Sequence, residues 1–278
     1  MARAGRSRLG GLDRRAVRAS VIALVSTVAF FGVLTWVVVN SPGWPRIQAS
    51  FLDARVFGDA LPDLVGAFVV NAQLFLVAEV LVLVFGLVLA IVRSLPGPVF
   101  FPLRALATIY ADIFRAIPGL LVVYVLGFGI PASRLVDPKT PQVVYGIAAL
   151  TLVYTAYVSE VYRAGIESVH PSQEAAARSL GLSRFQALRH VVVPQAVRRV
   201  IPPLLNDFIG LQKDTVLVST IGLVEIFREA QIKNLANFNF TPYMAVALIF
   251  IVVTIPLTRL TDWLVARDRR RGARGGTR

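Results

Sequence analysis

Polar and charged side chains interrupt an apolar stretch of the chain between residues 201 and 223. These side chains belong to Asn206, Asp207, Gln212, Lys213 and Asp214. A charge at the centre of a membrane-spanning helix costs ~2.5–3.5 kcal/mol on insertion scales, so such groups usually face a protein interior or a water-filled cavity. The stretch as a whole is therefore expected to line a polar route through the membrane. Single charges can instead pair structurally, because Asp207 and Asp214 are spaced to share one helix face and Lys213 lies beside Asp214.

The residue types do not favour thiol, metal or ATPase chemistry. The chain has no cysteine, which excludes disulfides, thiolate chemistry and cysteine-based metal sites. His170 and His190 are the only histidines and do not form an HExxH motif, so no metal site is expected. A phosphate-binding G-x-x-x-x-G-K-S/T motif is also missing, so the chain cannot supply an ATPase itself. We therefore expect a protein that is not an enzyme and binds no cofactor of its own.

The composition indicates an all-α membrane protein with several spans. Of the 278 residues, 56% are hydrophobic and 16% are charged, whereas about 25% are charged in soluble domains. The apolar residues form long blocks, such as Val21–Val39, Val80–Val92 and Tyr243–Leu257. A helix needs ~20 mostly apolar residues to cross a hydrocarbon core ~30 Å thick. The blocks exclude a soluble enzyme, a disordered chain and an outer-membrane barrel, whose strands would alternate over ~10 residues.

Block length and flanking charge predict about six membrane-spanning helices. Their approximate bounds are Val17–Val39, Phe68–Val92, Leu103–Ile130, Val143–Tyr162, Ile201–Leu223 and Tyr243–Val265. The third helix is expected to kink at Pro118. The fifth contains the five polar side chains named above and is expected to score poorly on hydropathy. Two segments are expected to be outer loops: the one that contains Asp53, Asp59 and Asp63, and Glu225–Thr241.

The net charge of +13 arises mainly from arginines that cluster along the chain. They lie in the first 18 residues, in Arg163–Arg199, which we name the 163–199 loop, and in the tail after Arg267. Lys and Arg are enriched in cytoplasmic segments, so both termini and this loop are expected in the cytoplasm. Because the arginines do not interleave with aromatic residues on a polar surface, nucleic-acid binding is not expected. The first apolar block exceeds the ~7–15 residues of a signal peptide, which favours an uncleaved first span.

The 163–199 loop has the pattern of two short amphipathic helices. Its cap and turn residues are Ser172, Gly181, Ser183 and Pro194. The serines can cap the two helices, the glycine permits a tight turn between them, and the proline is expected to break the chain again. The apolar residues Leu182, Phe185, Leu188 and Val192 form a stripe between arginines. Such a stripe can dock into a groove of another protein, or it can cover the membrane face of its own bundle.

Several ordered motifs resemble those of permease subunits of bacterial ABC importers. The loop reads EAAARSLGLS over Glu174–Ser183 and VVVPQA over Val191–Ala196, similar to the family's EAA motif, its glycine and its hydrophobic-x-hydrophobic-Pro ending. Tyr157–Gly165 and Asp112–Pro118 resemble motifs of the polar amino acid permeases of the histidine, glutamine and glutamate type. With Gly181 aligned, the family's glutamate falls on Ala175, and this chain has Glu174 one position earlier. On a helix that offset rotates the carboxylate by about 100°.

The resemblance extends from about Leu61 to Arg267 and implies the type I permease fold of ABC importers. It implies three parts: a basic segment with an additional first span and an outer loop over 1–60, the transmembrane domain over 61–266, and a basic cytoplasmic tail over 267–278. By resemblance, the residues that couple the loop to an ATPase are Glu174, Ala175, Gly181, Leu182, Phe185, Leu188 and Pro194.

The function implied by the resemblance is the import of polar or charged amino acids across the inner membrane of a bacterium. The implied partners are a homodimer of ABC ATPase subunits, which uses the ATP and Mg, an extracytoplasmic substrate-binding protein, and a second permease, identical or homologous. The alternative is a secondary transporter of small polar solutes. Such a transporter would use an ion gradient, and it would usually have a longer chain with internal repeats.

Overall fold

The computed structural model describes residues 14–137 and 139–275, and over these ranges it contains helices and no strands. The chain divides into two compact units, Met1–Asp53 and Ala54–Arg278, and each is described by itself. The all-helical fold predicted from the composition is confirmed.

The first unit contains the helices α1 (Arg14–Val39) and α2 (Trp44–Phe51). The segment Val17–Val39 contains an 18-residue stretch with a mean hydropathy of 2.4 and is long and apolar enough to cross a membrane, in agreement with the predicted first span. The helix ends where the side chains of Asn40 and Ser41 donate hydrogen bonds to carbonyls of the last turn, at 2.8 and 2.7 Å. These bonds satisfy carbonyl groups that a helix end leaves without partners.

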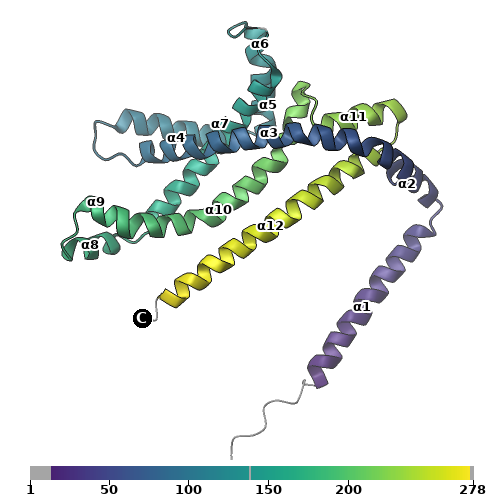
Figure 1. Cartoon of the computed structure of the whole chain (residues 1–278), viewed down its shortest axis with the longest axis horizontal. Helices are drawn as coiled ribbons and strands as arrows, with labels where there is room; N and C mark the ends of the chain where they lie inside the picture. The colour runs from purple at the N-terminus through teal and green to yellow at the C-terminus, as the bar shows by residue number, and fades with distance from the viewer. Residues whose placement is uncertain (1–13, 138, 276–278) are drawn as a thin grey trace, which may run out of the picture. The chain divides into compact units, whose positions relative to one another are not determined.

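The second unit contains the remaining helices (Figure 1). The elements before the 163–199 loop are α3 (Ala54–Arg93), α4 (Phe101–Ala116), α5 (Gly119–Tyr124), the π-helical turn η1 (Val125–Gly129), α6 (Ile130–Ser133) and α7 (Gln142–Glu167). Within and after the loop are α8 (Pro171–Ser179), α9 (Arg184–Ala187), the π-helical turn η2 (Leu188–Val192), α10 (Val193–Asp214), the 3-10 helix η3 (Thr215–Ile221), α11 (Ile226–Asn237) and α12 (Thr241–Gly275). The helices α8 and α9 lie at one end of α7 and α10 (Figure 1).

Four helices of the described chain are long and apolar enough to cross a membrane. They lie in Val17–Val39, Trp44–Arg93, Gln142–Glu167 and Thr241–Arg267. A fifth span results if α4 and the helices after it are counted together, although this pair is bent by 104°. The bend lies at Pro118, where the kink was predicted. The polar helix α10 does not qualify by hydropathy, as its sequence predicted.

The structure corrects several local predictions. Asp59 and Asp63 lie within the long helix α3 and not in a loop. Pro62, which could have ended this helix, lies inside it. The segment predicted as an outer loop over 225–241 contains α11, whose first residue follows the N-cap Glu225. The cap of α8 is His170 and not Ser172, because the imidazole Nδ1 of His170 accepts the Ser172 N–H at 3.2 Å.

The main core of the second unit forms where α3 and α7 pack against each other and against α10 and η3. It contains Leu74, Phe75, Ala78 and Val82 of α3, Tyr145, Ala149, Leu150, Val153, Tyr154 and Val158 of α7, Leu211 of α10, and Val218 and Ile221 of η3. A second buried cluster joins α3 to α11 and α12 through Ala60, Leu64, Ile226, Ala230, Ala245 and Val246. The first cluster holds α7 and α10 in fixed places on α3, and the second holds α11 and α12 there.

A buried polar group of side chains, which we name the Asn71 cluster, also joins α3 to the start of α11. Asn71 Nδ2 donates to Glu225 Oε2 at 2.8 Å and to Thr215 Oγ1 at 3.1 Å. Asn71 Oδ1 accepts the Ile226 N–H at 3.0 Å, and Glu225 Oε1 accepts the Arg228 N–H at 2.8 Å. Burial raises the pKa of Glu225, although the hydrogen bonds from Asn71 and the backbone oppose this effect.

Candidate functional site

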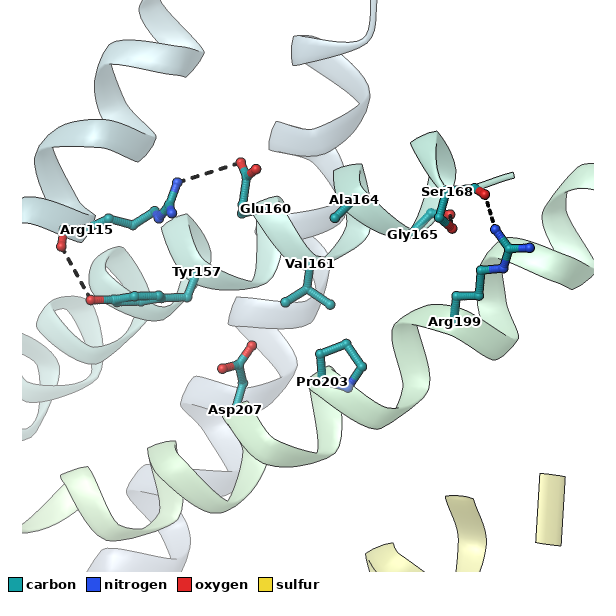
Figure 2. A pocket seen from close by; sticks show the side chains of 10 residues that line it. All are labelled: Arg115, Tyr157, Glu160, Val161, Ala164, Gly165, Ser168, Arg199, Pro203 and Asp207. Atoms are coloured by element: carbon teal, nitrogen blue, oxygen red, sulfur yellow. Dashed lines mark hydrogen bonds and ion pairs between the residues drawn. The ribbon is translucent and has the colours of Figure 1, made fainter. Parts of the chain in front are cut away.

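An open cavity of about 380 Å³ lies between α4, α7 and α10 (Figure 2). Its lining consists of Arg115, Tyr157, Glu160, Val161, Ala164, Gly165, Ser168, Arg199, Pro203 and Asp207. Arg115, Glu160 and Asp207 give the lining both cationic and anionic side chains. A cavity that offers both signs of charge can hold a small zwitterion.

The break between α4 and α5 places Arg115 at the cavity. Proline disfavours a helical conformation in the residue before it, and Ile117 accordingly has an extended ψ of 132°. Arg115 is therefore in the last turn of α4, next to carbonyl groups that the break leaves without helical partners. Tyr157 of α7 donates a hydrogen bond from its hydroxyl to the Arg115 carbonyl at 3.4 Å. A broken helix is tolerated at membrane depth where it lines a cavity or is covered by protein.

Glu160 of α7 is surrounded by arginine side chains. It forms an ion pair with Arg93 of α3 at 2.8 Å and another with Arg163, which also pairs with Glu167. Arg115 approaches the same carboxylate only to 3.8 Å, and 39% of its side chain is exposed. Arg93 and Arg163 already compensate the charge of Glu160. Arg115 therefore retains hydrogen-bond donors for a group inside the cavity.

Asp207 of α10 lies on the cavity wall (Figure 2). Its Oδ2 atom is buried and accepts no hydrogen bond, and among the described residues Asp207 forms no ion pair. A buried polar atom that lacks a partner is costly, so a cationic group in the cavity would stabilise Asp207.

The other polar residues predicted to line a route lie in different surroundings. Asn206 is exposed and lines a separate pocket of about 530 Å³ that includes Thr261 of α12. Gln212 is buried and accepts a hydrogen bond from Thr254 at 3.2 Å, and its Nε2 has no partner among the described residues. Asp214 accepts a hydrogen bond from the Tyr154 hydroxyl at 2.8 Å. Only Asp207 of the five therefore lines the cavity.

Lys213 does not pair with its acidic neighbours on α10. Its side chain is exposed, and within the described part of the chain no ion pair joins it to Asp207 or Asp214. Asp214 instead has a tyrosine as its partner. The sequence could not indicate this partner, because Tyr154 is 60 residues away along the chain.

The 163–199 loop has the two short helices that its sequence predicted. Ser183 caps α9 in a capping box, with its hydroxyl accepting the Gln186 N–H at 3.3 Å and the Gln186 side chain accepting the Ser183 N–H at 2.9 Å. Gly181 has a φ of +90°, which glycine adopts most readily. Pro194 does not break the chain as predicted. It lies where the π-helical turn η2 runs into α10, and the helical path continues through it.

Much of the surface predicted to dock another protein is accessible in the chain. Phe185 is 69% exposed, Leu188 36%, and Leu182 is partly buried. Leu180, which the predicted stripe omitted, is 85% exposed. Ala175 is also exposed, whereas Glu174 lies 3.8 Å from Arg184. Large apolar side chains exposed at a loop are typical of an interaction surface.

Sequence reasoning assigned no individual role to Arg93 or Arg115, and for Glu160 it favoured structural pairing, which the ion pairs with Arg93 and Arg163 bear out. The motifs Asp112–Pro118 and Tyr157–Gly165 contain Arg115 and Glu160, but the sequence alone does not show that α4 and α7 meet at a cavity. Arg93 lies at the end of α3, where it was expected to flank a span. The signal that could have identified these residues is their occurrence in ordered motifs beside a membrane helix.

Comparisons with known proteins agree with this architecture. Residues 82–270 match the family described as "Binding-protein-dependent transport system inner membrane component". The probable amino-acid permease protein YxeN of Bacillus subtilis is 33% identical over 212 residues, which cover 76% of this chain and 93% of that protein. The glutamate transport system permease protein GluC of Corynebacterium glutamicum is 34% identical over 219 residues, with coverages of 73% and 93%.

Two solved structures share the fold. An amino acid ABC transporter crystallised with histidines has a chain that is 30% identical, with a TM-score of 0.68 and coverages of 74% of this chain and 94% of that one. The MetNI methionine ABC transporter, at 18% identity and a TM-score of 0.60, shows the same fold over 74% of this chain and 95% of its own. The chain therefore belongs to the family of binding-protein-dependent transport system inner membrane components.

Proposed function

We propose that this permease subunit of an ABC amino acid importer passes its substrate through the cavity between α4, α7 and α10. In this proposal Arg115 receives the α-carboxylate and Asp207 receives the α-ammonium group. Relatives are named as glutamine, glutamate and arginine permeases, and their substrates share this zwitterionic part. The observation that carries the proposal is the buried oxygen of Asp207, which lacks a partner in a cavity that also contains the accessible Arg115.

The remaining parts of an importer are proposed to come from other chains. A second permease, identical or homologous, pairs with this one, and an extracytoplasmic binding protein delivers the amino acid. Two ATPase subunits, which bind the ATP and Mg, grip the 163–199 loops of the pair. The exposed side chains of Leu180 and Phe185 support this assignment of the loop. The arginine clusters support a cytoplasmic location for both termini and the loop.

Transport by the complete complex tests the role of the cavity. The permease would be reconstituted in liposomes with its ATPase and binding protein, and uptake would be measured for a panel of labelled amino acids. Hydrogen bonds to charged groups contribute about 1.5–3 kcal/mol, so Arg115→Gln and Asp207→Asn should each raise the KM for uptake roughly tenfold or more. ATPase association should be unchanged in both variants.

Arg259→Gln is a suitable control because it removes an exposed arginine of α12. The nearest acidic group, Asp262, is 4.0 Å away, so the ion pair that is lost is weak. This variant should transport like the wild type. Unchanged KM values for both cavity variants would contradict the proposed substrate contacts. A wild-type complex that does not take up any amino acid with ATP would contradict the proposed function itself.

A further inference from the structure

The two ends of the 163–199 loop are fastened to each other by a set of contacts that we name the loop clasp. The clasp consists of Gly165, Ser168 and Val169 at the end of α7, and Val192, Ala196, Arg199 and Val200 in η2 and α10. It closes the loop at the point where its two ends enter the membrane-embedded helices. The loop therefore begins and ends at one joint.

The polar contact of the clasp joins Arg199 to the end of α7. Its guanidinium donates a hydrogen bond to the Ser168 carbonyl (Figure 2). Ser168 is the C-cap of α7, so its carbonyl is one of those that the helix leaves without a partner. A cation at this end also interacts favourably with the helix dipole.

The apolar contacts of the clasp lie on the loop side of this bond. Val169, Val192 and Ala196 form a separate buried cluster, with exposed fractions of 7%, 8% and 5%. Gln195 also donates a hydrogen bond to Gln173 of α8 at 3.4 Å. The first loop helix is thus held against the start of α10, and the loop cannot swing independently of that helix without opening this cluster.

The closest approach of the clasp lies at Gly165. A Cβ atom at this position would lie 2.0 Å from Val200 Cγ1 and 3.5 Å from the Ala196 carbonyl oxygen. The two helices therefore meet at a distance that only glycine permits. Contacts packed this closely have low compressibility and transmit a displacement instead of absorbing it.

The clasp and the cavity share residues. Gly165, Ser168 and Arg199 belong to the clasp and also line the cavity (Figure 2). Pro203 and Asp207 continue the same wall along α10. A movement of the loop that keeps the clasp closed must move this wall as well.

We propose that Arg199 is a positioning residue that holds the clasp closed, so that the 163–199 loop, the end of α7 and the start of α10 move as one body. This inference rests on the proposed function, in which ATPase subunits grip the loop. A displacement imposed on the exposed surface of α8 and α9 then reaches the cavity wall at Asp207. If the clasp were open, the loop would follow the ATPase while the wall stayed behind.

The test compares ATP hydrolysis with transport in the reconstituted complex of permease, ATPase and binding protein. Arg199→Ala should lower the number of amino acids moved per ATP hydrolysed by about tenfold, the scale expected for the loss of one hydrogen bond from a charged group. ATPase association and the KM for substrate should stay at wild-type values. Arg199→Lys keeps one cationic donor for the Ser168 carbonyl and should restore most of the coupling.

Arg198→Ala is the matched control. Arg198 is the preceding residue on the same helix, is exposed, and forms no hydrogen bond or ion pair within the described part of the chain. The control removes the same charge at almost the same place, so its coupling should equal that of the wild type. A loss of coupling equal to that of Arg199→Ala would show that only the net charge matters and would overturn the proposal.

A second series tests the clasp without changing a charge. Gly165→Ala should uncouple transport from hydrolysis, because the new methyl group forces α7 and α10 apart at Val200. The double variant Gly165→Ala with Val200→Ala gives that methyl group room and should regain most of the coupling. Failure of the double variant to recover would count against the close approach as the cause.

Three further outcomes would overturn the inference. Wild-type coupling in Arg199→Ala would show that the bond to Ser168 transmits nothing. A raised KM at unchanged coupling would assign Arg199 to substrate binding instead. Loss of ATPase association in Arg199→Ala would mean that the residue shapes the docking surface. Absence of ATPase association in the wild type would overturn the proposed function and the clasp together, whereas the first three outcomes affect the clasp alone.

Discussion

Two polar side chains inside the second unit, Asn71 and Asp207, differ in whether their hydrogen-bonding groups are satisfied. Asn71 uses both its amide and its carbonyl in bonds to Thr215, Glu225 and the Ile226 backbone. Asp207 leaves a buried oxygen without a partner at a cavity. A satisfied buried group stabilises the fold, whereas an unsatisfied one requires another explanation, such as a ligand.

The Asn71 cluster should dominate the stability of the contact between α3 and the start of α11. Asn71→Leu removes the partner of a buried carboxylate and of a buried N–H, so the free energy of unfolding should fall by about 2–3 kcal/mol or more. Thermal unfolding in detergent, followed by tryptophan fluorescence, would measure the loss. Gln73→Leu on the exposed face of the same helix is the control and should change stability little. Equal melting temperatures for both variants would contradict this role.

The raised pKa of Glu225 predicts a pH dependence of stability. The unfolded carboxyl group ionises near 4.5, whereas the buried one ionises at a higher pH, because burial disfavours its charged form. Between these two values the folded protein binds more protons than the unfolded one, so stability should fall as the pH rises through the interval. Glu225→Gln should lose this contribution, and its melting temperature should vary less with pH over that interval. Identical pH profiles for the two proteins would contradict the assignment.

At the scale of elements, some local signals in the 163–199 loop were read correctly from the sequence, whereas the cap at Ser172 and the break at Pro194 were not. Ser183 and Gly181 shape the loop as expected, because capping and left-handed turns depend on the nearest neighbours. The helix α11 was missed, because its helical structure is supported by packing of Ile226 and Ala230 against α3. The bend at Pro118 was predicted, but its size of 104° depends on how α5 packs.

Gly181 offers a test of the loop as an element. Its φ is +90°, and nothing lies within 4 Å of the position of a Cβ, so any cost of substitution comes from the backbone and not from a clash. Gly181→Val should cost about 1–2 kcal/mol and reduce the amount of ATPase that copurifies with the permease. Gly181→Asn should be milder, since asparagine tolerates the left-handed region better. Copurification at the wild-type level in the valine variant would refute this dependence.

The helix α10 should show a pattern of accessibility that reflects the cavity. The chain has no cysteine, so single cysteines can be introduced without background. Pro203→Cys and Asp207→Cys place the thiol on the cavity wall and should react with a small water-soluble maleimide. Leu211→Cys, at a position with 0% exposure, should not react. Equal reactivity at all three positions would mean that the cavity is not the aqueous route.

At the scale of the whole molecule, hydropathy predicts most of the spans, because each needs only length and apolar content. It cannot reveal α10, whose polar residues face the cavity, pockets and buried contacts of the second unit. It also cannot place Arg93 beside Glu160, which lies 67 residues away along the chain. The membrane fold was thus predictable, and the candidate site became visible only when three separate helices were assembled.

The orientation in the membrane that we propose from the arginine clusters can be measured directly. Ser183 and Asp59 are both exposed in the second unit. In intact cells, Ser183→Cys should be protected from a membrane-impermeant maleimide, whereas Asp59→Cys should be labelled. Permeabilised cells provide the control, because both cysteines should then react. The opposite labelling in intact cells would invert the topology.

The Asn71 cluster also has a consequence during synthesis of the chain on the ribosome. Asn71 and Glu225 are 154 residues apart, so at ~5–20 residues per second the ribosome needs roughly ten to thirty seconds to make the partner after the asparagine. During that time α3 carries an amide without its final hydrogen bonds. A nascent chain that stops before Glu225 keeps this defect permanently, which is expected to mark it for quality-control proteases. The same bonds that stabilise the finished permease thus distinguish a chain that has reached α11 from one that stopped earlier.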